Sequence, residues 1–422
     1  MYNFDEIIDR KNTNALKMDG FRDYIFHADD SMKFPFDDDD FIHMWVADME
    51  FATPDVIIDG IKKRLDKKIL GYTRVFTDDF YKSLLRWCER RHGWSFKREE
   101  LVTSNGIIPA LFELVDYILK DDEKVLFLTP SYAYFKYAAD SSNKESVCSD
   151  LILKDGYYTI DFEDLEKKAK DSKTKLFIFC NPHNPTGRVW KEEELKRIAN
   201  IIEKNDLWVI SDEIHCDLLR EGQKHIPLGK IMKDYHKLVT CMAASKTFNI
   251  AGLMFSSIII RDKNLRNTWN KNHYNFDNPL SIAASQAAYD EGENWLNAMS
   301  KYLDDNFKFT KEYLEKNLPK VKINISEATY LAWADFGEYF DVDEEITMFF
   351  AYKAGVLLEA GNMFVQNSGS FVRLNLACPR SYLKEGLDRI IDAVKNKHED
   401  KYYGEKIIKE CVIWLKIKNN LV

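Results

Sequence analysis

Short apolar runs alternate with amphipathic segments through the first two thirds of the chain. The runs that we interpret as buried strands are residues 101–103, 125–128, 176–180, 207–210 and 238–242. A further run at residues 255–260 is apolar and rich in β-branched side chains, which is typical of a strand buried on both faces. Between the runs, segments such as residues 191–204 place apolar positions at helical spacing. This alternation predicts an α/β fold in which helices cover both faces of a large, mainly parallel sheet.

The pattern changes after residue 291, where a long helical segment extends to residue 318. The elements expected beyond it are strands at 321–325, 330–335 and 372–376 and helices at 346–354 and 382–396. Such a mixture is typical of a smaller α+β domain. We therefore predict a large domain at residues 45–290 and a small domain at residues 291–396, a boundary that also draws on the family resemblance described below.

The two ends of the chain lie outside this pattern. Residues 1–44 are polar and aromatic without sustained periodicity. Their four aspartates at residues 37–40 favour a solvated loop over a calcium or magnesium site, because no glycine-punctuated ligand spacing follows. In the extension at residues 397–422, apolar side chains fall roughly on one helical face. We expect that face to pack on the small domain; a partner or membrane-surface role and a vector-derived origin are the alternatives.

Composition narrows the class of protein. A chain of 422 residues is long enough for two domains, and its 45% hydrophobic and 31% charged content is ordinary for a soluble globular protein. A net charge of -9 with scattered Lys and Arg argues against a nucleic-acid partner. No apolar run is long enough to span a membrane, and the first residues do not resemble a signal peptide, so we expect a cytoplasmic protein. The seven cysteines, including Cys180 and Cys216, fit reduced thiols better than disulfides or a zinc site.

Residues that suit chemistry better than packing follow five of the predicted strands. They are Gly106, Tyr132, Asn184, Asp212 and Lys246. Open α/β sheets bind ligands outside the carboxyl ends of their strands, so we expect these side chains to converge on one crevice. A lysine alone is usually a solvated surface group, and an aspartate after a strand is often a helix cap. Their combination changes that interpretation.

An amine and a carboxylate in one such crevice suit pyridoxal 5'-phosphate. Lys246 would form the Schiff base with the aldehyde of this cofactor. Asp212 would hold the pyridine nitrogen protonated, so that the ring can accept electrons. Small neighbours on the amino-terminal side of Lys246 leave space for a bulky group. We therefore predict a pyridoxal phosphate site.

Several motifs in order carry a resemblance to a known family. NPHNPTG at residues 181–187, DEIH at 212–215 and SK at 245–246 resemble the class I/II aminotransferase superfamily of fold type I pyridoxal phosphate enzymes. WVADMEF at 45–51, GYT at 71–73 and GSFVRLNLACP at 369–379 are similar to its cystathionine β-lyase branch, which cleaves carbon–sulfur bonds. The resemblance covers roughly residues 20–395. It implies that residues 1–44 form an arm that packs on the small domain or on a partner subunit.

The resemblance also implies roles for cofactor-binding residues. Asn184 would donate to the 3'-oxygen of the ring, and His215 would share this duty unless it is a structural histidine. Tyr132 would stack on the ring. For the phosphate, the donors would be the backbone amides of Gly106 and Ile107 at the start of a helix; a plain tight turn is the alternative there. Ser245, next to Lys246, would also bind the cofactor.

Two further roles concern the partner subunit and the substrate. Tyr72 would reach the phosphate of a neighbouring subunit, which makes the protein an obligate homodimer with shared active sites. Arg373 would bind the α-carboxylate of an amino-acid substrate with its planar fork, a surface salt bridge being the alternative. Once released from the cofactor, Lys246 would take the α-proton. No role in the site requires a metal.

These features favour a carbon–sulfur β-lyase acting on L-cystathionine, cysteine or S-substituted cysteines. Aspartate aminotransferase-like members have a phosphate-binding arginine where this chain has Met254, which fits the lyase branch. An aminotransferase with the same cofactor is the alternative, because fold alone does not decide between the two reactions. A non-enzymatic regulator would have a fused DNA-binding module or lack the lysine, and the sequence shows neither.

Overall fold

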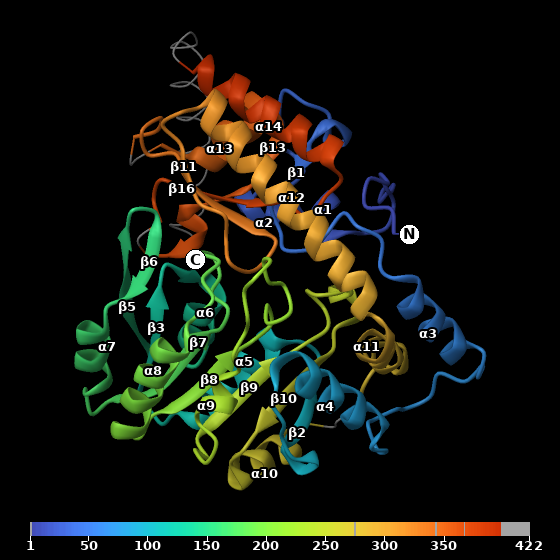
Figure 1. The fold of residues 1–422 in the computed structure, drawn as a ribbon, viewed down its shortest axis with the longest axis vertical. Coiled ribbons are helices and arrows are strands. Elements are labelled where there is room, and N and C mark those ends of the chain that lie inside the picture. Colours follow the sequence, from blue (N-terminus) through green and yellow to red (C-terminus); the bar gives the residue numbers. More distant parts are fainter. Residues whose placement is uncertain (1, 274–275, 342–343, 367, 398–422) are drawn as a thin grey trace.

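The computed structural model describes residues 2–273, 276–341, 344–366 and 368–397 (Figure 1). Its central element is an eight-stranded sheet in the order β2-β10-β9-β8-β7-β3-β5-β6. The strands are β2 (Leu101–Ser104), β3 (Lys124–Thr129), β5 (Glu145–Lys154), β6 (Tyr157–Ile160), β7 (Thr174–Cys180), β8 (Trp208–Asp212), β9 (Leu238–Met242) and β10 (Ser256–Ile260). Strands β5, β3, β7, β8 and β9 are mutually parallel, while β10 and β6 run antiparallel to their neighbours. The sheet is therefore mainly parallel, as predicted.

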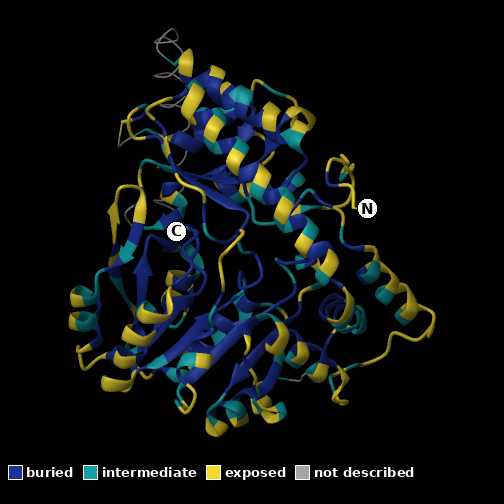
Figure 2. Cartoon of the chain, viewed as in Figure 1, coloured by how far each residue is buried: buried dark blue, intermediate teal, exposed yellow. Residues whose placement is uncertain are grey.

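Alternate residues of these strands feed two separate cores, one on each face of the sheet. Phe127 and Ile178 belong to a core with helices α5 and α6, whereas Leu126 and Phe177 belong to a core with α7 and α8. The helices of this region are α5 (Ile107–Ile118), α6 (Ala133–Ser141), α7 (Phe162–Ala169), α8 (Glu192–Lys204), α9 (Leu228–Ile231) and α10 (Lys263–Asn272). Figure 2 shows the sheet buried and the outer helix faces exposed.

Local sequence signals start several of these helices. The side chains of Asp161 and Asp262 accept hydrogen bonds from the first backbone N–H groups of α7 and α10. Asn278 caps α11 (Pro279–Glu291), whose first residue is proline, a position where its missing N–H is no loss. Helices α3 (Asp55–Leu65) and α4 (Asp79–His92) lie on the same side of the molecule as α11, and the 3-10 turn η2 (Arg98–Glu100) directly precedes β2.

A second, smaller sheet lies above the first in Figure 1, in the order β11-β12-β16-β14. The long helix α12 (Glu293–Asn317) runs from beside α11 toward it. The other elements of this region are β11 (Lys322–Ile323), β12 (Leu331–Asp335), α13 (Ile346–Ala354), β13 (Val356–Leu357), β14 (Glu359–Ala360), η4 (Gly361–Met363), β15 (Phe364–Val365), β16 (Phe371–Asn375) and α14 (Arg380–Lys395). Strand β15 pairs with β4 (Ser131–Tyr132) of the large sheet's region, so the two parts of the chain are joined there.

The amino-terminal arm packs on this second region. It contains α1 (Leu16–Asp19), α2 (Phe21–Phe26), η1 (Asp38–Asp40) and β1 (Ile42–His43). Strand β1 pairs in parallel with β13, and Phe21 and Trp45 share an apolar cluster with Met348 of α13. In the aspartate run, Asp38 pairs with Arg22 and Asp39 with Lys11, so these carboxylates are held by cations of the arm.

The predicted elements agree with the structure to within a few residues at their ends. The strand predicted at 238–242 and the helix predicted at 346–354 have the same bounds in the structure. The domain boundary near residue 290 stays a prediction, although α12 begins close to it. The extension at 397–422 lies outside the described residues except for its first residue. Among the described residues, no helix is long and apolar enough to cross a membrane.

Strand β10 provides a test of how the sheet is stabilised. Ile258 is fully buried in the core that contains α5, so Ile258→Ala should lower the free energy of unfolding by about 2–5 kcal/mol through lost apolar contacts and a residual cavity. Ile152 on β5 is 48% exposed, and the matched Ile152→Ala should change it by less than about 0.5 kcal/mol. Urea denaturation of both variants measures this difference; equal effects would contradict the burial described here.

Candidate active site

The carboxyl ends of β2, β3, β7, β8 and β9 open on the same edge of the large sheet. Strand β10 is antiparallel to both of its neighbours, so β2 points in the same direction as β9. Lys246 follows β9, and Asp212 is the last residue of β8. Burial lowers the pKa of Lys246, and the negative charges of Asp48, Glu359 and Asp212 partly oppose that effect. These charged groups therefore lie near Lys246, and the region between them is called the crevice below.

Lys246 is held by a backbone carbonyl of the WVADMEF segment. Its Nζ donates to the oxygen of Ala47 at 2.6 Å, and the hydroxyl of Tyr330 donates to the same oxygen at 2.8 Å. Burial lowers the pKa of the Lys246 amine. A larger fraction of the amine is consequently neutral than in an exposed lysine, which suits a residue that must act as a nucleophile and a base.

Asp212 is a buried carboxyl group with few partners. It is 6% exposed, and its Oδ1 accepts a hydrogen bond from the backbone N–H of Ile214 at 3.2 Å. Burial raises its pKa to about 7, with the Ile214 hydrogen bond and the charge of Lys246 opposing that effect. A carboxyl group in this state gains strongly from a cation placed beside it.

His215 lies three residues further along and is also buried. Burial, helped by the nearby charges of Lys246 and Arg373, lowers its pKa to about 3, so the imidazole is neutral at neutral pH. Its Nδ1 has no hydrogen-bond partner within the described protein. Buried polar atoms normally have a hydrogen-bond partner, so this nitrogen can bind a ligand group or a water.

Arg373 is buried, so it does not form the surface salt bridge that was the alternative to a role in substrate binding. It is 2% exposed on β16, and its Nη1 donates to Oδ1 of Asn184 at 3.1 Å. Its Nη2 pairs with the carboxylate of Glu359 on β14, while its Nε has no partner among the described residues. Asn184 and Arg373, predicted separately, therefore meet across the two regions of the chain.

Aromatic side chains line the crevice beside Arg373. Tyr132 on β4 stacks on Tyr134 with ring centroids 5.1 Å apart. Tyr24 of the amino-terminal arm interacts with Tyr134, and burial together with the charge of Glu359 raises the pKa of Tyr24. The sequence analysis missed Tyr24 and Glu359. For Glu359 a signal existed, because it is a lone charge in the apolar run at residues 356–360.

The four remaining predicted residues lie near the start of α5, beside Lys246 or on the surface. Gly106 precedes α5 with a φ of +143°, a conformation that favours glycine, and Ile107 is the first residue of that helix. The N–H groups of this first turn have no acceptor within the helix and so suit an anion. Ser245 is half-buried beside Lys246. By contrast, Tyr72 is 93% exposed, and its ring is tilted against the ring of Phe276 with the centroids 5.0 Å apart.

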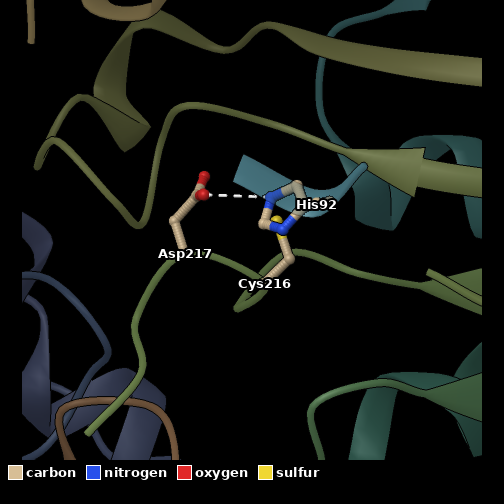
Figure 3. A group of neighbouring side chains, drawn as sticks. All are labelled: His92, Cys216 and Asp217. Carbon is tan, nitrogen blue, oxygen red and sulfur yellow. Dashed lines mark ion pairs between the residues drawn. The ribbon is translucent and has the colours of Figure 1, made fainter. Parts of the chain in front are cut away.

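A buried group that resembles a metal site lies behind DEIH. It contains His92, Cys216 and Asp217 (Figure 3). The carboxylate of Asp217 already accepts hydrogen bonds from Arg91 at 3.1 Å and from Trp87 at 3.0 Å, and it pairs with His92 at 3.1 Å. These donors hold the pKa of Asp217 at about 2 against the opposing effect of burial. Burial also raises the pKa of the Cys216 thiol, which disfavours the thiolate that a metal requires. The group is therefore a structural support for the loop.

The residues of the crevice fit pyridoxal phosphate. The orphaned Nδ1 of His215 and the sparsely bonded carboxyl of Asp212 offer positions for ring substituents and for a protonated ring nitrogen. The partly desolvated amine of Lys246 suits an aldehyde, and the start of α5 suits a phosphate.

Comparison with known proteins supports this interpretation. The family model described as aminotransferase class I and II matches residues 39–390. The chain is 36% identical to cystathionine beta-lyase PatB of Bacillus subtilis, over 92% of this chain and 98% of that protein. The structure superposes on the pyridoxal phosphate-bound C–S lyase of Staphylococcus hominis with a TM-score of 0.91 and 50% identity, over 93% of this chain and 98% of that one. It also superposes on cystalysin of Treponema denticola, which contains pyridoxal 5'-phosphate, with a TM-score of 0.86 and 36% identity, over 94% of this chain and 100% of that one.

The raised pKa of Asp212 predicts a pH-dependent stability difference. In the cofactor-free protein, the folded state keeps Asp212 protonated up to about pH 7, whereas the unfolded chain releases that proton near pH 4. Wild type should therefore lose stability relative to Asp212→Asn as pH rises from about 4 to 7, by about 2–4 kcal/mol in total. Urea denaturation across this range measures it. A difference that stays constant with pH would contradict the burial of Asp212.

Proposed function

Because this chain belongs to the class I and II aminotransferase family, we propose that it is a pyridoxal phosphate-dependent carbon–sulfur β-lyase. Its substrates would be L-cystathionine, cysteine or other S-substituted cysteines, and its products a thiol, pyruvate and ammonia. The observation that carries the proposal is the 50% identity, over nearly the whole length, to a C–S lyase with pyridoxal phosphate bound. Met254, which stands where aspartate aminotransferase-like members have an arginine, agrees with it.

Pyridoxal phosphate supplies an aldehyde for the substrate amine and a ring that accepts the electron pair left by the α-proton. Lys246 would hold the aldehyde of the cofactor and, once released as a neutral amine of lowered pKa, would take the α-proton. Its hydrogen bond to Ala47 keeps the amine aimed into the crevice. Departure of the thiolate from the β-carbon, followed by reaction with water, releases pyruvate and ammonia and consumes no oxidant.

Other residues of the crevice bind and orient. Asp212 stays ionised when a protonated ring nitrogen lies beside it, and so holds that proton in place. Arg373 would bind the substrate α-carboxylate through its unpartnered Nε and the adjoining N–H group. Asn184 and His215 would donate to the 3'-oxygen, and Tyr132 would stack on the ring face.

We also infer a homodimer in the cytoplasm. An exposed apolar surface at the edge of the large sheet's region supports the dimer. Its side chains come from the segment at residues 69–76 and from two later positions, and all are more than half exposed: Ile69, Leu70, Tyr72, Phe76, Met254 and Phe276. Among them, the rings of Tyr72 and Phe276 are in contact. Large exposed apolar side chains gathered in this way are typical of a protein interface. With a second copy docked there, Tyr72 would contribute to the partner's phosphate site.

Product analysis separates the lyase from an aminotransferase. With L-cystathionine and no keto acid, a lyase returns the aldehyde form of its cofactor after every cycle. Pyruvate, ammonia and homocysteine should therefore accumulate over many turnovers, which a coupled dehydrogenase assay and thiol titration measure. An aminotransferase would instead convert about one equivalent of L-cystathionine to its keto acid, release no homocysteine, and resume only with 2-oxoglutarate; that result would reject the lyase.

Subunit mixing tests Lys246 and the shared site together. Lys246→Ala should lack turnover while keeping its fold, and Tyr72→Ala should lose most of its activity. A dimer of one subunit of each kind contains one intact site, so a re-equilibrated equal mixture should regain roughly a quarter of wild-type activity. Circular dichroism and sedimentation check folding and assembly. A mixture no more active than the average of its two parents would contradict the shared site.

A further inference from the structure

The carboxylate of Glu359 lies inside the crevice without a role in the reaction described above. It is 5% exposed, and Glu359 and Arg373 are direct cross-strand partners in the β14–β16 pair. Side chains at directly opposed positions of an antiparallel pair lie on the same face within contact distance. The ion pair between Glu359 and Arg373 is thus fixed by the register of the small sheet.

Arg373 is enclosed on several sides. Glu359 pairs with Nη2, Asn184 accepts from Nη1 at 3.1 Å, and the ring of Phe364 covers the guanidinium with its centroid 5.1 Å away. The Nε, which has no described partner, is left for a ligand. A substrate carboxylate that binds this guanidinium must therefore lie close to the carboxylate of Glu359.

The charge of Glu359 is also felt in the rest of the crevice. It raises the pKa of Lys246 and of Tyr132, in each case behind the dominant effect of burial. Two like charges a few ångströms apart in a partly dehydrated site repel strongly enough to change an affinity by tenfold or more, on the order given by Coulomb's law with a protein-like dielectric. Glu359 therefore opposes the binding of the same anion that Arg373 attracts.

We propose that Glu359 is a specificity-determining residue, a built-in counter-ion that weakens the hold of Arg373 on carboxylates. Ligands that bind only through a carboxylate, such as keto acids, are then retained poorly. An amino-acid substrate compensates with its amine and its sulfur substituent. The product pyruvate leaves readily, and keto-acid acceptors of transamination are disfavoured. This inference rests on the proposed function in one respect, the assignment of Arg373 to the substrate carboxylate.

The test uses the protein loaded with pyridoxal phosphate and two unreactive ligands of equal length, butanoate and its neutral isostere butyramide. Glu359→Gln keeps an oxygen for the Arg373 Nη2 but removes the charge. It should tighten butanoate binding by about tenfold or more and leave butyramide within about twofold, measured by isothermal titration calorimetry. If Glu359 only anchored Arg373, the same substitution would leave butanoate binding unchanged or weaken it, and either result overturns the proposal.

Two control variants isolate the charge. Glu359→Asp retains the carboxylate and should keep the butanoate affinity within about threefold of wild type. Glu359→Met is uncharged and of similar volume, and it should tighten butanoate binding as Glu359→Gln does, so the result does not depend on the folding of one variant. A similar gain in Glu359→Asp would show that shape, not charge, is responsible and would overturn the proposal.

Arg373→Lys separates this proposal from the proposed function. It should weaken butanoate binding markedly, because an ammonium cannot replace the planar fork. Unchanged butanoate binding in Arg373→Lys would overturn both the assignment of Arg373 and the role of Glu359, while leaving sustained pyruvate release intact. Loss of pyruvate release in wild type would instead reject the lyase, and the binding comparison for Glu359 would still stand.

Discussion

The site depends on one constraint, the burial of ionisable groups at the carboxyl edge of a parallel sheet. Asp212 ends β8 and is 6% exposed, and Lys246 follows β9 and is half-buried, so both groups have limited contact with bulk water. Burial makes charge unfavourable for both, which raises the pKa of the acid and lowers that of the base. A cofactor with a cationic ring nitrogen and an aldehyde relieves both penalties, and the chemistry proposed here follows from that relief.

The crevice is assembled from three parts of the chain that are distant in sequence. The large sheet contributes Lys246, the small sheet contributes Arg373, and the segment after the arm contributes the carbonyl of Ala47. Hydrogen bonds join these parts directly, from Lys246 and Tyr330 to Ala47 and from Arg373 to Asn184. Because these hydrogen bonds connect the parts, a change in packing between the two regions would alter substrate binding by Arg373 and proton transfer by Lys246 together.

The sequence was informative where a clear strand or helix pattern was followed by a residue that suits chemistry better than packing. The buried runs before Asp212 and Lys246 had the right length for strands, and the helices of the large region had clear amphipathic spacing, so the α/β fold and these two residues could be predicted. Glu359 was marked in the sequence only as a lone charge in an apolar run. Its pairing with Arg373 could not be predicted, because it comes from the register between two short strands, which tertiary pairing decides. The carbonyl of Ala47 has no signature at all, since every residue has one. Tyr24 lies in an arm without sustained periodicity.

In the proposed function, the carboxylate of Asp212 lies beside the pyridine nitrogen of pyridoxal phosphate. Carbon-13 NMR of labelled aspartate, with Asp212→Asn to assign the signal, follows its ionisation directly in both forms of the protein. The account predicts a midpoint near pH 7 without cofactor, where burial raises the pKa to about 7, and an ionised carboxylate down to about pH 5 once pyridoxal phosphate is bound, because an opposite charge lowers a carboxyl pKa. Titration of Asp212 at the same pH in both forms would contradict the account.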